Sequence, residues 1–179
     1  PILAVVGRSN SGKTTLLEKL IRELTARGRR VGTIKHHAHE PVRVDVPGKD
    51  SWRHRRAGAA AVALDSSDLF FVVRDRPEGL TPETIAHLAL FGMDVILVEG
   101  FTDSPIPKIE VNRRAQSVPL LCGPGEGLVA VVADWSTGAP VPQFDPEAIG
   151  PLADFVEREF LQGAPPPAVE ALVGDRRVA

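Results

Sequence analysis

The opening of the chain constrains the fold most, because an apolar strand runs directly into a glycine-rich loop and then into a helix. Ile2–Val6 is an unbroken apolar run, as in a strand buried on both faces of a parallel sheet. Residues 7–14 read Gly-Arg-Ser-Asn-Ser-Gly-Lys-Thr and match the G-x-x-x-x-G-K-[ST] spacing of a phosphate-binding loop. Apolar residues then recur at helical spacing over residues 14–27, with Gly28 at a helix-cap position. The sequence therefore predicts a nucleotide-binding strand–loop–helix unit.

The residue types in this loop explain how it would hold a nucleotide. Glycines allow the backbone to curl so that successive N–H groups and the helix N-terminus point at phosphate oxygens. Lys13 would reach the β and γ phosphates, and the Thr14 hydroxyl would hold Mg²⁺. The residues expected to contact nucleotide in the loop are Gly7, Asn10, Ser11, Gly12, Lys13 and Thr14.

A phosphate loop of this kind also needs an acidic residue at the tip of a neighbouring strand, to hold the metal or orient a water. Residues 95–98 are entirely apolar and end at Glu99, which we predict to serve the metal or the water. Asp94 stands at the other end of the same strand, so we do not expect it at the site. An exposed strand-end carboxylate without function is the alternative interpretation of Glu99.

A polar stretch follows the second predicted strand, over residues 30–35, and we interpret it as a long surface loop of residues 36–49. Lys35 and His36, at the end of that strand, are candidates for contact with phosphate. His36, His37 and His39 would together suit a metal, but no cysteine lies nearby and no second ligand pair stands at a fixed spacing from them. A solvated histidine group is therefore the competing interpretation.

The densest basic patch lies just downstream, and its members are Lys49, Arg53, His54, Arg55 and Arg56. If residues 51–58 are helical, Lys49, Arg53 and Arg56 share one side, which suits nucleotide phosphates or another anionic small molecule. A solvated basic face is the alternative. Asp45 and Asp50, in the same region, could support Mg²⁺ indirectly. For the base, Asp134 follows an apolar strand, residues 128–133, and could accept the N–H groups of guanine, although no N/T-K-x-D motif is present.

The rest of the chain predicts a three-layer α/β fold of the P-loop NTPase type, with a mostly parallel sheet and ligand at the carboxyl ends of the strands. Further strands are expected at residues 61–64, 69–73 and 108–111, the last at an edge, with antiparallel pairing near 61–73 and 108–112. Helices are expected from Thr81 to about Phe91 and from Asp145 onward. We assign residues 1–161 to one nucleotide-binding domain and residues 162–179 to a proline-rich tail.

Bulk properties limit the class of protein. The formal net charge of −2 gives no general attraction to nucleic acid. No apolar run approaches the roughly 20 residues that span a bilayer, so no membrane contact is expected. The single cysteine, Cys122, cannot form an internal disulfide, which favours the cytoplasm.

Several segments together resemble one family, the MobB-type molybdopterin-guanine dinucleotide biosynthesis adapter proteins. They are residues 6–15, Gly-Thr-Ile-Lys-His-His at 32–37, Val-Pro-Gly-Lys-Asp-Ser at 46–51 with Arg53, Ala-Gly-Ala at 57–59, Leu-Val-Glu-Gly-Phe at 97–101 and Pro-Lys-Ile-Glu-Val at 107–111. The resemblance spans residues 2–161. The phosphate loop is shared by many families, whereas the Lys-His-His and Pro-Gly-Lys-Asp-Ser segments in this order are more specific.

The resemblance implies a GTP-binding homodimer with weak GTPase activity that assists a guanylyltransferase in attaching GMP to molybdopterin. It further implies that Gly12, Lys13, Thr14 and Thr15 bind nucleotide and Mg²⁺, and that molybdopterin or its nucleotide form is a partner. The chain departs from the family in having Thr102, where a lysine is common, and in its proline-rich tail. Two other interpretations of the phosphate loop remain open: a small-molecule or nucleotide kinase, and a metallochaperone GTPase.

Overall fold

The computed structural model describes residues 1–37, 44–116, 119–123 and 125–163, and its residues group into two compact units. The first unit comprises Pro1–His36 and the chain from Thr81 onward, and the second comprises His37–Leu80. The second unit and the two boundaries between the units lie inside the segment predicted as one domain, residues 1–161. Most of the predicted tail and His39 lie outside the described residues. Within the described ranges, no helix is both long and apolar enough to cross a bilayer.

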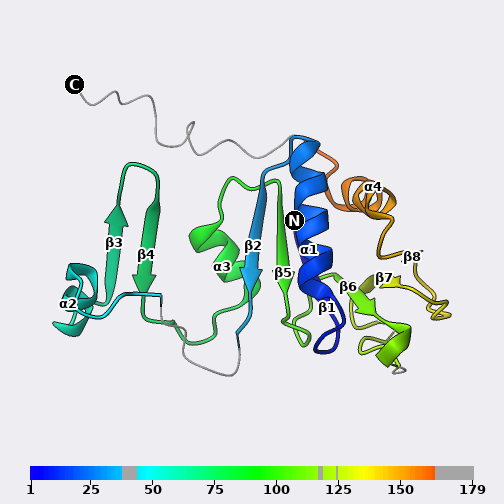
Figure 1. Ribbon diagram of the computed structural model, residues 1–179, viewed down its shortest axis with the longest axis horizontal. Coiled ribbons are helices and arrows are strands. Elements are labelled where there is room, and N and C mark those ends of the chain that lie inside the picture. The colour runs from blue at the N-terminus through cyan, green and yellow to red at the C-terminus, as the bar shows by residue number, and fades with distance from the viewer. Residues whose placement is uncertain (38–43, 117–118, 124, 164–179) are drawn as a thin grey trace. The chain divides into compact units, whose positions relative to one another are not determined.

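The first unit is built on a six-stranded sheet in the order β2-β5-β1-β6-β7-β8 (Figure 1). Every pairing in it is parallel. Its strands are β1 (Ile2–Val6), β2 (Val31–Lys35), β5 (Val95–Glu99), β6 (Lys108–Asn112), β7 (Leu128–Ala133) and β8 (Gln143–Phe144). Because β5 and β6 flank β1, the carboxyl ends of both strands meet at the loop that follows β1.

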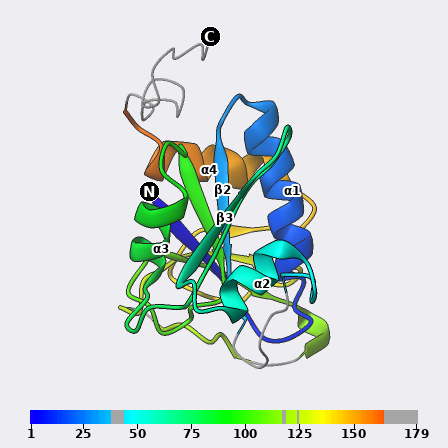
Figure 2. The same cartoon turned by 90° about the vertical axis from the view of Figure 1, so that its left-hand side faces the viewer.

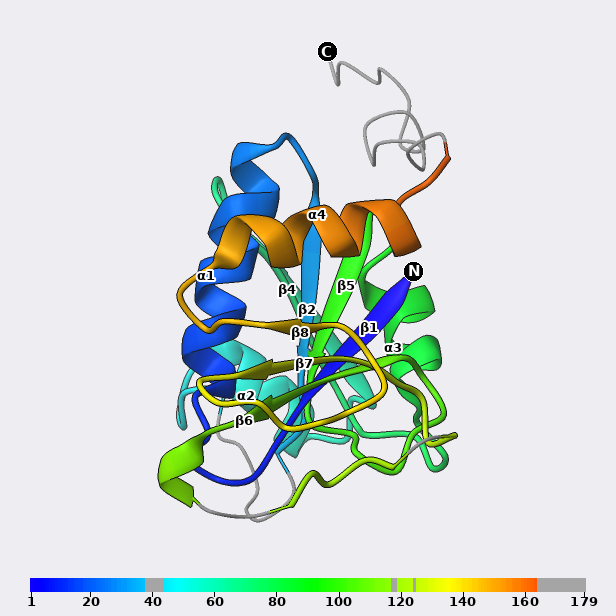
Figure 3. The ribbon, with the colours of Figure 1, turned by 90° about the vertical axis from the view of Figure 1, so that its right-hand side faces the viewer.

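Helices cover both faces of this sheet, as the predicted three-layer fold requires. Alternate residues of β1 divide between the two faces: Leu3 and Val5 join the cluster formed with α1 (Lys13–Ala26) and α4 (Ile149–Phe160). Figure 3 shows α4 crossing beside α1. Ala4 and Val6 belong to the opposite cluster, which includes Ala86 of α3 (Pro82–Ala89). The central strands are therefore buried on both sides, which explains their continuous apolar runs.

Most predicted elements are confirmed within one or two residues, but two predictions were wrong. β6 is an interior strand, parallel to both β1 and β7, and not an antiparallel edge strand. The connection from β5 to β6, residues 100–107, contains no helix, although a parallel crossover usually does. The charged side chains of Lys108 and Glu110 are buried in β6, although charged residues usually indicate an exposed strand. Neither the length of the connection nor the polarity of the strand therefore indicated an interior position. The last helix begins at Ile149 rather than at Asp145, because Asp145 caps a turn by accepting a hydrogen bond from the Glu147 N–H (2.7 Å).

The second unit is a short helix and a hairpin. Helix α2 (Asp50–Arg56) contacts β3 (Ala61–Asp65), and Figure 2 shows the two side by side. Strand β3 pairs antiparallel with β4 (Phe70–Arg74), as Figure 1 shows. The predicted antiparallel character of residues 61–73 is therefore confirmed. Large apolar side chains on this hairpin are exposed to solvent: Leu64, Leu69, Phe70, Phe71 and Val72. Such a surface is unusual for an isolated unit.

Candidate functional site

The backbone of the loop after β1 depends on its glycines. Gly7 has φ +145°, and a Cβ there would lie 2.5 Å from the Val111 carbonyl oxygen and 2.7 Å from Ser11 Oγ. Gly12, which precedes α1, has φ +95°, and Asn10 adopts a left-handed φ of 61°. Any larger residue at position 7 would collide with β6 as well as strain the backbone. Both motif glycines are therefore required by the geometry.

Glu99 lies beside this loop and contacts residues from two other elements. Its carboxylate accepts a hydrogen bond from Thr14 Oγ1, which lies 3.2 Å from either oxygen. The same carboxylate forms an ion pair with Lys35 Nζ. Lys35 is opposite Glu99 in the β2–β5 register, which places the two side chains at the same strand ends. The predicted neighbours Thr14, Lys35 and Glu99 are thus brought together at the carboxyl edge of the sheet.

Lys13 belongs to the same charged group. Its ammonium donates to the Arg8 carbonyl oxygen at 2.7 Å, so the lysine side chain folds back over its own loop. Partial burial lowers the pKa of Lys13 from the usual 10.5, Glu99 opposes that change, and Lys35 adds to it. Glu99 pairs with Lys35 and influences Lys13 only through the electrostatic field, so two ammonium groups lie near one carboxylate and positive charge remains beside the loop. Such an arrangement attracts phosphate.

His36, directly after β2, packs along the Glu99-Gly100-Phe101 segment. Its N–H donates to the Glu99 carbonyl oxygen at 3.0 Å, and its ring stacks at a tilt on Phe101, with centroids 4.4 Å apart. Gly100 has φ +94°, and a Cβ there would lie 3.1 Å from His36 Cβ. The Lys-His and Glu-Gly-Phe sequences are therefore one structural feature, formed where β2 and β5 end together.

A segment that the sequence analysis did not assign closes the loop from the other side. Arg113, directly after β6, donates from Nε to the Ser11 carbonyl oxygen at 3.3 Å, and Gln116 donates from Nε2 to the Ser9 carbonyl oxygen at 2.7 Å. The available signal was a basic pair, Arg113-Arg114, immediately after a strand. This basic pair could be linked to the phosphate loop only if β6 was known to lie next to β1, and the sequence did not reveal that pairing.

Asp134 stands at the end of β7, as predicted, and its carboxylate already has protein partners. It accepts from the Arg114 backbone N–H at 2.8 Å and lies 3.8 Å from Arg113 Nη1. The neighbouring Trp135 donates from Nε1 to Asn112 Oδ1 at 3.1 Å. The contact of Asp134 with the nucleotide base stays a prediction.

Other predicted residues lie in the second unit or away from the loop. Asp45 accepts from Ser51 Oγ at 2.9 Å, and Arg53 pairs with Asp50 at 3.3 Å, both within the second unit. Lys49 precedes α2 as its N-cap residue. Their roles toward nucleotide or Mg²⁺ stay predictions. Asp94 pairs with Arg30 at 3.1 Å at the far end of β5, which agrees with its exclusion from the site.

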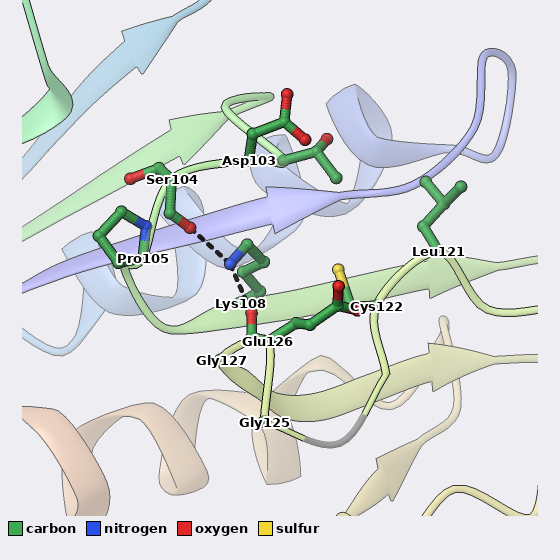
Figure 4. A pocket seen from close by; sticks show the side chains of 10 residues that line it. Asp103, Ser104, Pro105, Lys108, Leu121, Cys122, Gly125, Glu126 and Gly127 are labelled. Atoms are coloured by element: carbon green, nitrogen blue, oxygen red, sulfur yellow. Dashed lines mark hydrogen bonds between the residues drawn. The ribbon is translucent and has the colours of Figure 1, made fainter.

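A cavity of about 410 Å³ lies beside the start of β6 (Figure 4). The Lys108 ammonium donates to the carbonyl oxygens of Ser104 and Glu126, each at 2.6 Å. Glu110 accepts from the backbone N–H of Leu121 and Cys122. Burial raises the pKa of the Cys122 thiol and so suppresses its reactivity, as expected of a packing residue. The Pro-Lys-Ile-Glu-Val segment thus anchors the surrounding backbone.

No three His, Cys, Asp or Glu side chains of the described ranges converge as a metal cluster would require. The oxygen atoms that come together at the loop are those of Thr14 and Glu99. This pair suits Mg²⁺, which usually takes one or two protein oxygens and completes its shell with phosphate and water.

Comparisons with known proteins agree with this geometry. A family model described as Molybdopterin guanine dinucleotide synthesis protein B matches residues 2–134. The chain is 39% identical over 160 residues to the molybdopterin-guanine dinucleotide biosynthesis adapter protein of Haemophilus influenzae, with 88% of each chain covered. It is 39% identical to the Escherichia coli adapter protein, covering 87% of this chain and 91% of that protein. A crystal structure of molybdopterin-guanine biosynthesis protein B superposes with a TM-score of 0.67 at 26% identity, covering 88% and 97% of the two chains.

Proposed function

Since the chain belongs to the molybdopterin guanine dinucleotide synthesis protein B family, we propose that it is an adapter that binds GTP and Mg²⁺, hydrolyses GTP slowly and assists the attachment of GMP to molybdopterin. The observation that carries the nucleotide part is the convergence of Lys13, Thr14 and Glu99 at the phosphate loop. The adapter part is supported by the names of relatives that the chain covers almost completely.

Mg²⁺ would be held by the Thr14 hydroxyl and the Glu99 carboxylate, whose oxygens already lie within hydrogen-bond distance of each other. The metal supplies charge neutralisation for the phosphates when bound. The Lys13 ammonium would donate to phosphate oxygens instead of the Arg8 carbonyl oxygen, so its positive charge would face a negatively charged partner. The N–H groups of the loop and of the start of α1, including those of Gly12 and Thr15, would complete the phosphate site.

The contacts of Glu99 support the proposal that hydrolysis is slow. Its carboxylate is engaged by Thr14 and Lys35, so it is arranged to neutralise charge rather than to remove a proton from water. Catalysis then rests on positioning and electrostatic stabilisation by Lys13, which is enough for a slow reaction. The same contacts would let the chain retain GTP long enough to serve a guanylyltransferase.

A cytoplasmic homodimer is part of the proposal. The hairpin β3–β4 exposes 67% of Leu69 and 73% of Phe70, and burying such side chains against a second copy would remove them from water. Molybdopterin and the guanylyltransferase are the remaining proposed partners, by analogy with the names of the relatives.

The experiment that tests the function is a guanylyltransferase assay with molybdopterin and Mg-GTP, run with and without this chain. Product should form faster when the chain is present, and Lys13→Ala should remove the gain because the lysine no longer binds phosphate. Arg22→Ala is the matched control, since it removes one exposed positive charge from α1 away from the loop. An equal gain with Lys13→Ala would contradict the proposed role of the nucleotide.

A further inference from the structure

We infer that Arg113 is a positioning residue that ties the carboxylate of Asp134 to the phosphate loop, so that recognition of the base and binding of the phosphates depend on each other. This inference rests on the proposed function, because it takes Asp134 as the acceptor for the base. It assigns the coupling to a residue after β6 that contacts both parts of the site.

The guanidinium of Arg113 spans the two features. At the loop, Nε donates to the Ser11 carbonyl oxygen at 3.3 Å, and Nη2 lies 3.2 Å from the position that a Cβ on Gly12 would occupy. Toward β7, Nη1 lies 3.8 Å from Asp134 Oδ2. The glycine at position 12 therefore gives room for the guanidinium as well as for the turn into the helix.

Neighbouring residues reinforce the same link. The Arg114 N–H donates to Asp134 Oδ1 at 2.8 Å, and Gln116 Nε2 donates to the Ser9 carbonyl oxygen at 2.7 Å. Residues 113–116 thus contact the loop twice and Asp134 twice. A planar, forked guanidinium can contact two groups in fixed directions, which a lysine ammonium on a flexible stem does less well.

Asp134 keeps the capacity to bind a base in this arrangement. A carboxylate offers about four acceptor positions, and Asp134 uses some of them for the Arg114 N–H and the Arg113 guanidinium. About two-fifths of its side chain is exposed (41%). The N1–H and 2-amino groups of guanine could therefore be accepted while Arg113 fixes the orientation of the carboxylate.

The test is a comparison of three probes: Mg-GTP, Mg-ITP, which lacks the 2-amino group, and inorganic tripolyphosphate, which has no base. Dissociation constants are measured for the wild-type chain, Arg113→Met, Asp134→Ala and the double variant, with Arg22→Ala as the charge control. The GTP-over-ITP preference should fall about tenfold in Arg113→Met, the loss of one hydrogen bond to a charged group. In the double variant the preference should fall no further than in Asp134→Ala, because Arg113 acts on the base only through Asp134.

A uniform weakening of all three probes in Arg113→Met, with the GTP-over-ITP ratio unchanged, would overturn the inference and leave Arg113 as a general phosphate or loop contact. A wild-type chain that binds Mg-GTP no better than Mg-ATP, titrated beside the three probes, would instead contradict the proposed function itself. If Arg113→Met fails to fold by circular dichroism, Arg113→Lys replaces it in the cycle, because it keeps the charge but cannot reproduce the forked contact.

Discussion

The phosphate-loop edge of the first unit and the hairpin of the second unit use their side chains in opposite ways. At the loop edge, polar and charged groups from the carboxyl ends of four strands and the start of α1 contact one another: Lys35 and Thr14 meet Glu99, while Arg113 reaches Asp134. On the hairpin, apolar side chains such as Phe70 face solvent. The polar groups of the first region are already paired around the loop, whereas the second region exposes an apolar surface of the kind that marks interaction sites.

The largest effect should come from breaking the organised region at Gly7. A Cβ there meets the Val111 carbonyl oxygen at 2.5 Å, so Gly7→Ala should lower the free energy of unfolding by about 3 kcal/mol or more. Gly28→Ala is the matched control, since Gly28 also has a positive φ (+81°) but no atom lies within 4 Å of its Cβ position. Its cost should be about 1–2 kcal/mol from backbone strain alone. Equal losses in urea unfolding would contradict the close contact.

The exposed hairpin should respond in association rather than in stability. Leu69→Ser combined with Phe70→Ser should weaken self-association about 100-fold, because two large apolar anchors are lost from the interface. The free energy of unfolding of the monomer should change by no more than about 0.5 kcal/mol. Sedimentation velocity over a concentration series measures the first quantity. Leu88→Ser, an exposed apolar residue of α3, is the control; an equal effect from it, or a wild-type chain that stays monomeric, would refute the assignment.

Substitution of Asp94 tests whether the ion pair at the amino end of β5 serves stability alone, in contrast to the pair at Glu99 beside the loop. Burial opposes its ionisation, but hydrogen bonds from Arg30 outweigh that cost and hold the pKa of Asp94 below the usual 3.8. Asp94→Asn should therefore lower the free energy of unfolding by about 2 kcal/mol at neutral pH, less than for a fully buried pair because Arg30 is partly exposed.

This stabilisation is fully present above pH 3.8 and is lost as the pH falls through the lowered pKa, so the wild type and Asp94→Asn should converge in acid. GTP affinity should not change, because Asp94 lies at the far end of the strand. A constant difference down to the acid limit would show that the ion pair is not the cause.

The smallest effect should be the pH dependence of nucleotide binding. Partial burial lowers the pKa of Lys13, and only the charged ammonium attracts phosphate. Affinity should therefore fall, by up to about tenfold, as the pH rises through a value below 10.5. Fluorescence titration with Mg-GTP at increasing pH measures this, with Lys13→Arg as the control that remains charged. Affinity that stays constant up to pH 10.5 would contradict the lowered pKa.

Local sequence patterns predicted the parts of the site that depend on neighbouring residues. The strand, loop and helix around Lys13 are consecutive, and Glu99 ends an apolar strand, so both could be predicted from spacing. The N-cap of α3 was also predicted correctly, since the Thr81 side chain accepts from the Thr84 N–H. The capping residue and the proline that follows it are adjacent in sequence.

What the sequence did not reveal depends on the order of the strands. The interior place of β6 follows from pairing between residues 4–6 and 108–110, which no local pattern records. Arg113 gains its contacts with Ser11 and Asp134 only through that placement. Sequence patterns also gave no indication that residues 37–80 form a separate compact unit, because their helix and strands are individually ordinary.

The most direct test of the central claim is the binding of GTP and ATP to the wild-type chain and to Glu99→Gln, each with and without Mg²⁺, by isothermal titration calorimetry. We expect GTP to be preferred, Mg²⁺ to raise the affinity of the wild type, and Glu99→Gln to remove the gain from Mg²⁺ while leaving metal-free binding in place. A preference for ATP, or an equal gain from Mg²⁺ in Glu99→Gln, would contradict the central claim.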